Sequence, residues 1–186
     1  VPPSGQHSQG VDSVWEMENH HHVVQKQVST RDYNYRQATE DMNTLVDATR
    51  GDTTTYGEAY HWADNYLTAG NSHDRNPAPE SGAFYARIRH ERYLNGQTQT
   101  RAVTSCPTLS PGMLLKVTGG YEVAEVFAQG VVITAMHSHA RRDEDFGVRF
   151  DGIPDSPDFS FRPEPGSRPV MAGTLPARVT STTEND

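Results

Sequence analysis

The sequence has one cysteine, no long apolar run and no basic cluster. Because Cys106 is the only cysteine among 186 residues, a disulfide within the chain is excluded, and we expect a buried, unreactive thiol. No stretch approaches the roughly 20 apolar residues that a membrane-spanning helix needs. The formal net charge is −8 and no run of Lys and Arg could form a phosphate-binding face. Nucleic acid and anionic membranes are therefore poor partners.

Hydrophobic residues are also scarce. They make up 34% of the chain, which is little for one large independent core. Aromatic and β-branched residues nevertheless recur throughout, unlike in a disordered chain. We therefore expect part of the stability to come from neighbouring domains or other subunits. The chain opens at Val1 rather than at methionine and closes on a polar stretch, so we expect a piece of a longer protein.

Short strand-like segments separated by glycine and proline dominate the pattern, which predicts a mainly β fold, an antiparallel barrel or sandwich. Residues 37–53 are polar and predict an excursion with one helical turn, and residues 63–80 predict a surface loop. Gly119 and Gly120 indicate a tight hairpin. The predicted strands are 14–17, 23–30, 53–62, 98–104, 113–117, 123–127, 131–137, 146–150 and 159–161, with another beginning at 170.

One helix is predicted, from Ser81 to about Gly96. Ser81 has the chemistry of an N-cap, and Gly96 is a typical C-terminal stop. Phe84 and Ile88 are four residues apart and should lie on one face. After Gly96 the apolar spacing changes to two, which marks the start of a strand.

Several motifs follow one another in a particular order. Val28 to Tyr35 forms a strand-like segment ending in Arg-Asp-Tyr-Asn-Tyr, and Ala86 to Glu91 reads Ala-Arg-Ile-Arg-His-Glu. Thr104 to Met113 contains Leu-Ser-Pro-Gly. This order resembles that of VgrG, the spike protein of bacterial type VI secretion systems. Further matches are Tyr60–Tyr66, which lacks the family's Pro-Gly-Arg, and two segments that resemble its passage from hub to OB-fold, Phe161–Pro163 and Pro169–Thr174.

The resemblance implies an antiparallel split β-barrel, similar to phage tail hubs, with a small β-α-β insertion. It divides the chain into four parts: 1–52, part of a first hub barrel and an excursion; 53–106, the insertion; 107–165, strands of a second hub barrel; and 166–186, a linker and the start of an OB-fold.

The resemblance also implies a structural role without a catalytic site or cofactor. Three copies would form the hub that joins the Hcp tube to the spike tip for effector delivery. The partners of the full-length protein would be a PAAR tip protein, baseplate components and effectors. Assembly would take place on the baseplate in the bacterial cytoplasm, followed by secretion or injection into a target cell.

The alternative from another class is a zinc-dependent hydrolase that uses His137 and His139. On a strand both imidazoles point the same way, which suits a metal, and Asp143, Glu144 and Asp145 could add oxygen ligands. His20 and His22 form a second pair of this kind. Since neither pair has a recognisable full ligand set, we expect that neither holds a stoichiometric ion.

Two further groups of side chains allow two interpretations each. Arg87, Arg89 and Arg92 beside Glu91 fit a solvated helix face or a charged contact between subunits. An aromatic set fits either packing in a core or interface, or stacking on a sugar. Its members are Tyr56, Tyr60, Trp62 and Tyr66.

Overall fold

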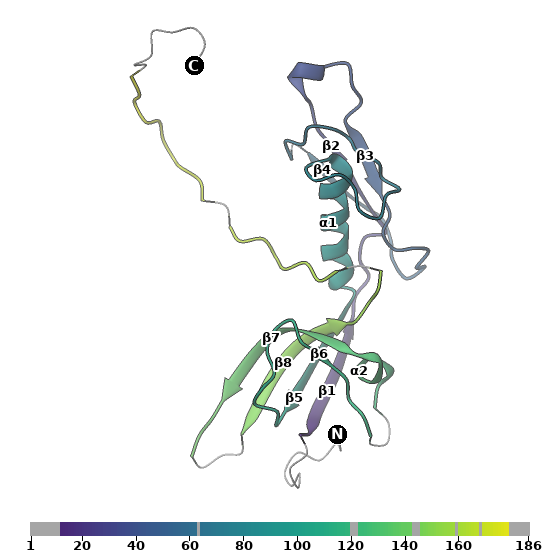
Figure 1. Ribbon diagram of the computed structural model, residues 1–186, viewed down its shortest axis with the longest axis vertical. Helices are drawn as coiled ribbons and strands as arrows, with labels where there is room; N and C mark the ends of the chain where they lie inside the picture. The colour runs from purple at the N-terminus through teal and green to yellow at the C-terminus, as the bar shows by residue number, and fades with distance from the viewer. Residues whose placement is uncertain are drawn as a thin grey trace.

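The computed structural model describes residues 12–62, 64–119, 123–142, 146–158, 160–167 and 169–178. It contains two sheets, one of five strands and one of three (Figure 1). The five-stranded sheet is antiparallel throughout and curls on itself, which confirms the predicted mainly β, hub-like fold. In sheet order its strands are β1 (Val14–His21), β5 (Thr98–Thr104), β8 (Gly147–Pro154), β7 (Val131–His139) and β6 (Leu114–Leu115).

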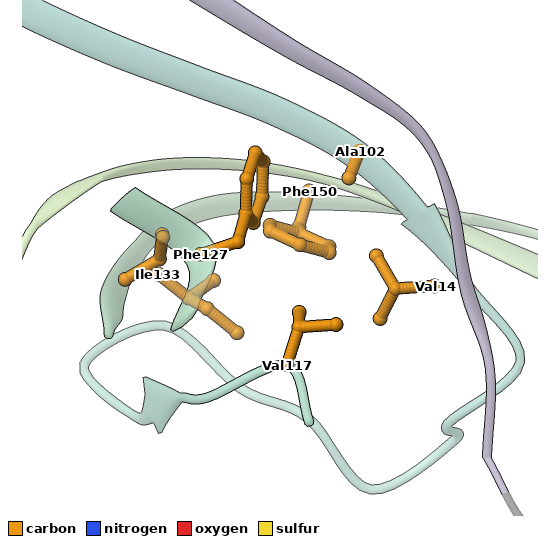
Figure 2. Close-up of a cluster of buried hydrophobic side chains, with 7 residues drawn as sticks. Val14, Ala102, Val117, Phe127, Ile133 and Phe150 are labelled. Carbon is orange, nitrogen blue, oxygen red and sulfur yellow. The ribbon is translucent and has the colours of Figure 1, made fainter. Parts of the chain in front are cut away.

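The curled sheet (β1, β5, β8, β7, β6 with residues 105–119 and 123–130) holds the largest apolar core among the described residues. Phe127, Ile133 and Phe150 meet there without exposure to solvent, together with Val14 and Ala102 (Figure 2). Burying such side chains contributes about 1.5–3 kcal/mol each. The strands pack so closely at position 152 of β8 that only glycine fits there. A β-carbon added to Gly152 would clash with Cγ1 of Val131, at 2.3 Å.

Phe127 belongs to a short helix, α2 (Glu125–Gln129), where the sequence predicted a strand over 123–127. That prediction was wrong for a physical reason. Strand alternation would put Glu125 on the same side as Phe127, inside the core. As a helix, the segment buries Phe127 and leaves Glu125 exposed.

The connection between the neighbouring strands β1 and β5 folds as a second body, the α/β unit (residues 22–97). Its sheet has the order β3 (Asn43–Val46), β2 (Gln27–Arg31), β4 (Glu58–Trp62), with β2 parallel to β4 and antiparallel to β3. A 3-10 turn, Tyr35–Gln37, follows β2. The sequence predicted an excursion with one helical turn over 37–53. Residues 43–46 of that range form a strand instead, because the alternating Thr44 and Val46 face inward while the segment pairs with β2.

The helix α1 (Gly82–Asn95) lies against one face of this sheet (Figure 1). The predicted caps are confirmed: Phe84 N donates to Ser81 Oγ at 3.2 Å, and Gly96 follows the last turn. Phe84 and Ile88 are only half-buried. Small side chains, Ala83 and Ala86, instead allow the helix to approach Val28 and Val46 closely. The strands that flank α1 in sequence, β4 and β5, belong to different sheets.

The chain after β8 forms no strand in the described residues 160–167 and 169–178, although strands were predicted at 159–161 and from 170. Phe159 lies outside the described residues. The segment 169–178 runs away from both sheets (Figure 1), and Val170, Met171 and Leu175 are exposed. It lies beside no strand with which it could exchange hydrogen bonds, and Pro163, Pro165, Pro169 and Pro176 remove donors along 163–178. In the part of the chain that the structure describes, no helix has the length and apolarity to cross a membrane.

Candidate assembly surfaces

The buried face of α1 carries a histidine that ties the helix to two loops. His90 is fully buried; its Nδ1 accepts from the backbone N–H of Ala48 at 2.9 Å, and its Nε2 lies 3.0 Å from the carbonyl oxygen of Gln25. These partners require a neutral ring with the proton on Nε2. Burial lowers the pKa of His90, although its hydrogen bond to Gln25 acts in the opposite direction.

A second tie joins α1 to the end of β4. The Asp64 carboxylate accepts hydrogen bonds from both terminal nitrogens of Arg89. It also accepts one from the hydroxyl of Thr30 at 3.2 Å. Nearby, Nε2 of His61 lies 3.2 Å from the hydroxyl of Tyr93. Burial, and then the charge of Arg89, lower the pKa of His61.

The Arg-Asp-Tyr motif after β2 has a local structural role. The Asp32 carboxylate accepts from the backbone N–H of Tyr33 at 2.8 Å and of Tyr66 at 3.0 Å. Tyr66 is buried, and its hydroxyl donates to the carbonyl of Met42. Burial raises the pKa of Tyr66 to about 12, so it stays a neutral donor. Asp32 therefore fixes the loop after β4 to the end of β2.

The third tie joins α1 to the segment that follows β8. Glu91 is 2% exposed and accepts from Nε of Arg87 at 3.0 Å and from Nε of Arg162 at 2.6 Å. Arg92 donates through Nε to the carbonyl of Pro163 at 3.1 Å. Two motifs of the VgrG resemblance, 86–91 and 161–163, thus meet in space. The interpretation of the helix arginines as a solvated face was wrong, since Arg87, Arg89 and Arg92 are all half-buried in contacts within the chain.

The face of the three-stranded sheet opposite α1 is open and partly apolar. Leu45, Tyr60 and Trp62 point outward with exposures of 50%, 60% and 55%. The register places Leu45 and Tyr60 on either side of Ser29, and Trp62 beside Arg31. Neither β3 nor β4 pairs with a further described strand on its outer edge. We call this surface, Arg31, Leu45, Tyr60 and Trp62, the open face. It is a candidate for contact with another chain, since three large apolar side chains gather there.

The other predicted members of the aromatic set lie elsewhere. Tyr66 is part of the core of the α/β unit, as described above, and Tyr56 precedes β4 with 82% of its surface exposed. Cys106, expected to be buried, is half-buried, and its Sγ lies 3.3 Å from Oγ1 of Thr108.

The two histidine pairs lie at exposed positions of the curled sheet. His137 and His139 are at the end of β7, where His137 is opposite Arg149 of β8. His20 lies on β1 with its Nε2 3.2 Å from Glu18, and His22 follows that strand. Asp143, Glu144 and Asp145 lie outside the described residues. Among the residues that the structure does describe, no three His, Cys, Asp or Glu side chains converge as metal ligands would.

Comparison with protein families gives a match over residues 1–144 to the phage tail baseplate hub (GPD) model. The chain belongs to the phage tail baseplate hub family. A solved structure, the c3393 protein of E. coli, is 30% identical and superposes with a TM-score of 0.55 over 94% of this chain. That protein is described as a component of the type VI secretion system with structural similarity to the T4 bacteriophage tail proteins gp27 and gp5. Both findings confirm the resemblance to a spike hub.

The chain spans 32% of the length of the c3393 protein. No curated protein matches.

Sequence reasoning found the two motifs that meet at Glu91 but not their contact. Arg162 lies 71 positions from Glu91 in the sequence. Helix and strand periodicities relate only residues a few positions apart, so they do not predict this contact. Asp64 and His90 lie within quoted motifs, but their structural roles were not predicted. The available signal was weak: His90 occupies the inward face of a helix, where a polar side chain needs buried partners.

Proposed function

We propose that this chain forms part of the trimeric hub of a VgrG-type spike in a type VI secretion system. The observation that carries the proposal is the hub-family match over most of the chain, together with the likeness to a type VI secretion component. The role is structural: the hub joins the Hcp tube to the spike tip, and effectors travel with the assembled tip.

The open face supports association between copies. Tyr60 and Trp62 are side by side on one strand, and aromatic side chains are enriched at the centres of protein interfaces. Arg31, next to Trp62, adds a cation at its rim. Contact with a second copy would remove these side chains from water, and an obligate interface of this kind buries more than about 2,000 Å² in total.

The same proposal assigns partners and location. The hub strands would face the Hcp tube, and a PAAR protein would close the distal tip of the full-length spike. Assembly would take place on the baseplate in the bacterial cytoplasm, before injection into a target cell. We assign no catalytic role to the described part of this chain, because its buried Asp32, His90 and Glu91 have structural partners within the fold.

The test is an assembly experiment with the full-length protein and its tube protein. Tubes formed in its presence are imaged by electron microscopy, and we expect density capping one tube end only. The double variant Tyr60→Ser/Trp62→Ser should abolish the caps. The control Tyr56→Ser should not, because Tyr56 is also aromatic and exposed but lies off the open face. Bare tube ends with the unaltered protein would refute the hub role.

A further inference from the structure

The curled sheet and the α/β unit are connected by a narrow neck. The chain enters the α/β unit after β1 and leaves it before β5, and the backbone N–H of His22 bonds to the carbonyl of Gln97 at 2.8 Å where the two crossings meet. The apolar clusters of the described residues stay within one body or the other. A two-stranded neck without a shared core leaves the two bodies able to tilt relative to each other.

Residues 156–158 and 160–163 make a third connection, which we call the latch. It leaves the end of β8 and crosses the lower part of α1 (Figure 1). Its backbone is bound by side chains of the α/β unit: Arg75 donates to the carbonyl of Pro157 at 2.9 Å, and Asn95 donates to that of Ser160 at 3.2 Å. Asn95 also accepts from the backbone N–H of Arg162 at 2.6 Å.

Charged side chains add to these contacts at both ends of the latch. The carboxylate of Asp158 pairs with Arg50. The backbone carbonyl of Asp158 accepts a hydrogen bond from Nη2 of Arg87 at 3.4 Å. At the other end, Arg162 pairs with the almost fully buried Glu91. A buried carboxylate needs such partners, because leaving it unpaired costs much more than the pair itself gains. Undocking of Arg162 leaves Glu91 with Arg87 but takes away the shorter of its two ion pairs, so Glu91 favours the state in which Arg162 is docked.

The space beneath the latch is an open hollow of about 390 Å³. The curled sheet contributes Arg101 and Asp151 to its lining, while Arg92 and Arg162 come from α1 and the latch. Apolar packing does not fill this space, so the polar ties of the latch hold the two bodies together on this side.

We propose that the latch is a device that sets the orientation of the α/β unit on the curled sheet, and that the Glu91–Arg162 pair is its lock. With the lock closed, the unit has three connections to the sheet and a single orientation. With it open, the unit tilts about the His22–Gln97 neck and the chain after Pro163 leaves in variable directions. This property belongs to the single chain and goes beyond the hub role.

The test measures this orientation in the full chain by pulsed electron resonance. Spin labels are placed at the exposed positions Tyr56→Cys in the α/β unit and Met113→Cys in the curled sheet, with Cys106→Ser. We expect one narrow distance distribution, and a clearly broadened one in Arg162→Met and in Glu91→Gln. Arg162→Met changes a residue outside both bodies, so broadening there does not reflect an unfolded α1.

The matched control is Arg101→Met, which removes a different arginine–carboxylate pair, Arg101–Asp151, beside the hollow but no latch contact. It should leave the distribution narrow. In hydrogen exchange, the backbone N–H of Arg162 should exchange about 10- to 100-fold faster in Glu91→Gln, while protection within α1 is retained. A broad distribution in the unaltered chain, or a narrow one in both lock variants, would overturn the proposal. Labelled chains are diluted with an excess of unlabelled chains, so that pairs of labels within one chain give the signal whether or not the protein forms trimers.

Discussion

The two bodies of this chain are stabilised in different ways. The curled sheet has an apolar core with two fully buried phenylalanines, Phe127 and Phe150 (Figure 2). The α/β unit buries mostly valine and alanine, and relies on polar side chains such as His90 and Glu91. Apolar packing tolerates small shifts, whereas buried polar groups require defined partners. The chain therefore combines a robust sheet with a unit whose geometry is specified by individual hydrogen bonds.

The largest effect is expected in the core of the curled sheet. Phe127→Ala should lower the free energy of unfolding by about 3–5 kcal/mol, because it removes a fully buried ring and leaves a cavity. Val28 is the largest fully buried apolar side chain among the described residues of the α/β unit, and Val28→Ala should cost only about 2 kcal/mol. The measurement is urea unfolding.

Each body contains one of the two tryptophans, Trp15 in β1 and Trp62 in β4. In Trp62→Phe the fluorescence of Trp15 reports unfolding of the curled sheet. In Trp15→Phe the fluorescence of Trp62 reports unfolding of the α/β unit. Equal costs for Phe127→Ala and Val28→Ala, or identical effects on both signals, would contradict the distinction between the bodies.

The next effect concerns the polar ties. His90→Ala should cost about 2–3 kcal/mol, because the backbone N–H of Ala48 and the carbonyl of Gln25 lose their buried partner. His90→Asn can keep the acceptor for Ala48 and His90→Gln the donor to Gln25, so each should cost less than alanine. The half-buried His61→Ala serves as the control in the same unfolding experiment. A loss below about 0.5 kcal/mol for His90→Ala would show that these bonds do not specify the unit.

A smaller effect should appear as a dependence on pH. In the folded chain the pKa of His90 lies below its ordinary 6.5, so between the two values the unfolded chain binds more protons. Stability should therefore fall as the pH drops below about 6.5, by at most about 1.4 kcal/mol per pH unit for this group. His61 acts in the same direction.

The measurement compares unfolding between pH 7.5 and 5 in the unaltered chain, His90→Gln and His61→Gln. The slope should be reduced in both variants, and more in His90→Gln because His90 is the more deeply buried of the two. A slope that is the same in all three proteins would contradict this assignment.

The smallest effect on folding is expected at the open face. Tyr60→Ser/Trp62→Ser should change the free energy of unfolding by less than about 0.5 kcal/mol per site, because both side chains are already exposed in the single chain. A large loss of stability would mean that these residues belong to the fold rather than to a contact with another chain. Thermal unfolding at low protein concentration provides the measurement.

Local patterns predicted much of the fold. The capped helix and the strand at 98–104 followed from signals within a few residues, and both are confirmed. Patterns failed where the deciding contact was distant. The segment 125–129 is helical because Phe127 is buried in the core while Glu125 stays exposed, and 43–46 is a strand because β2 lies next to it.

The candidate surfaces were predictable only in part. The exposed aromatic residues Tyr60 and Trp62 alternate along one strand, so their shared face could be inferred. The outward direction of that face could not, because it depends on which side α1 covers. The Glu91–Arg162 contact joins residues 71 positions apart, and no local pattern encodes it.

Sedimentation velocity of the full-length protein over a concentration series tests the hub account most directly. We predict a species of three copies that persists on dilution and is lost in Tyr60→Ser/Trp62→Ser but not in Tyr56→Ser. A single copy at every concentration would contradict the account.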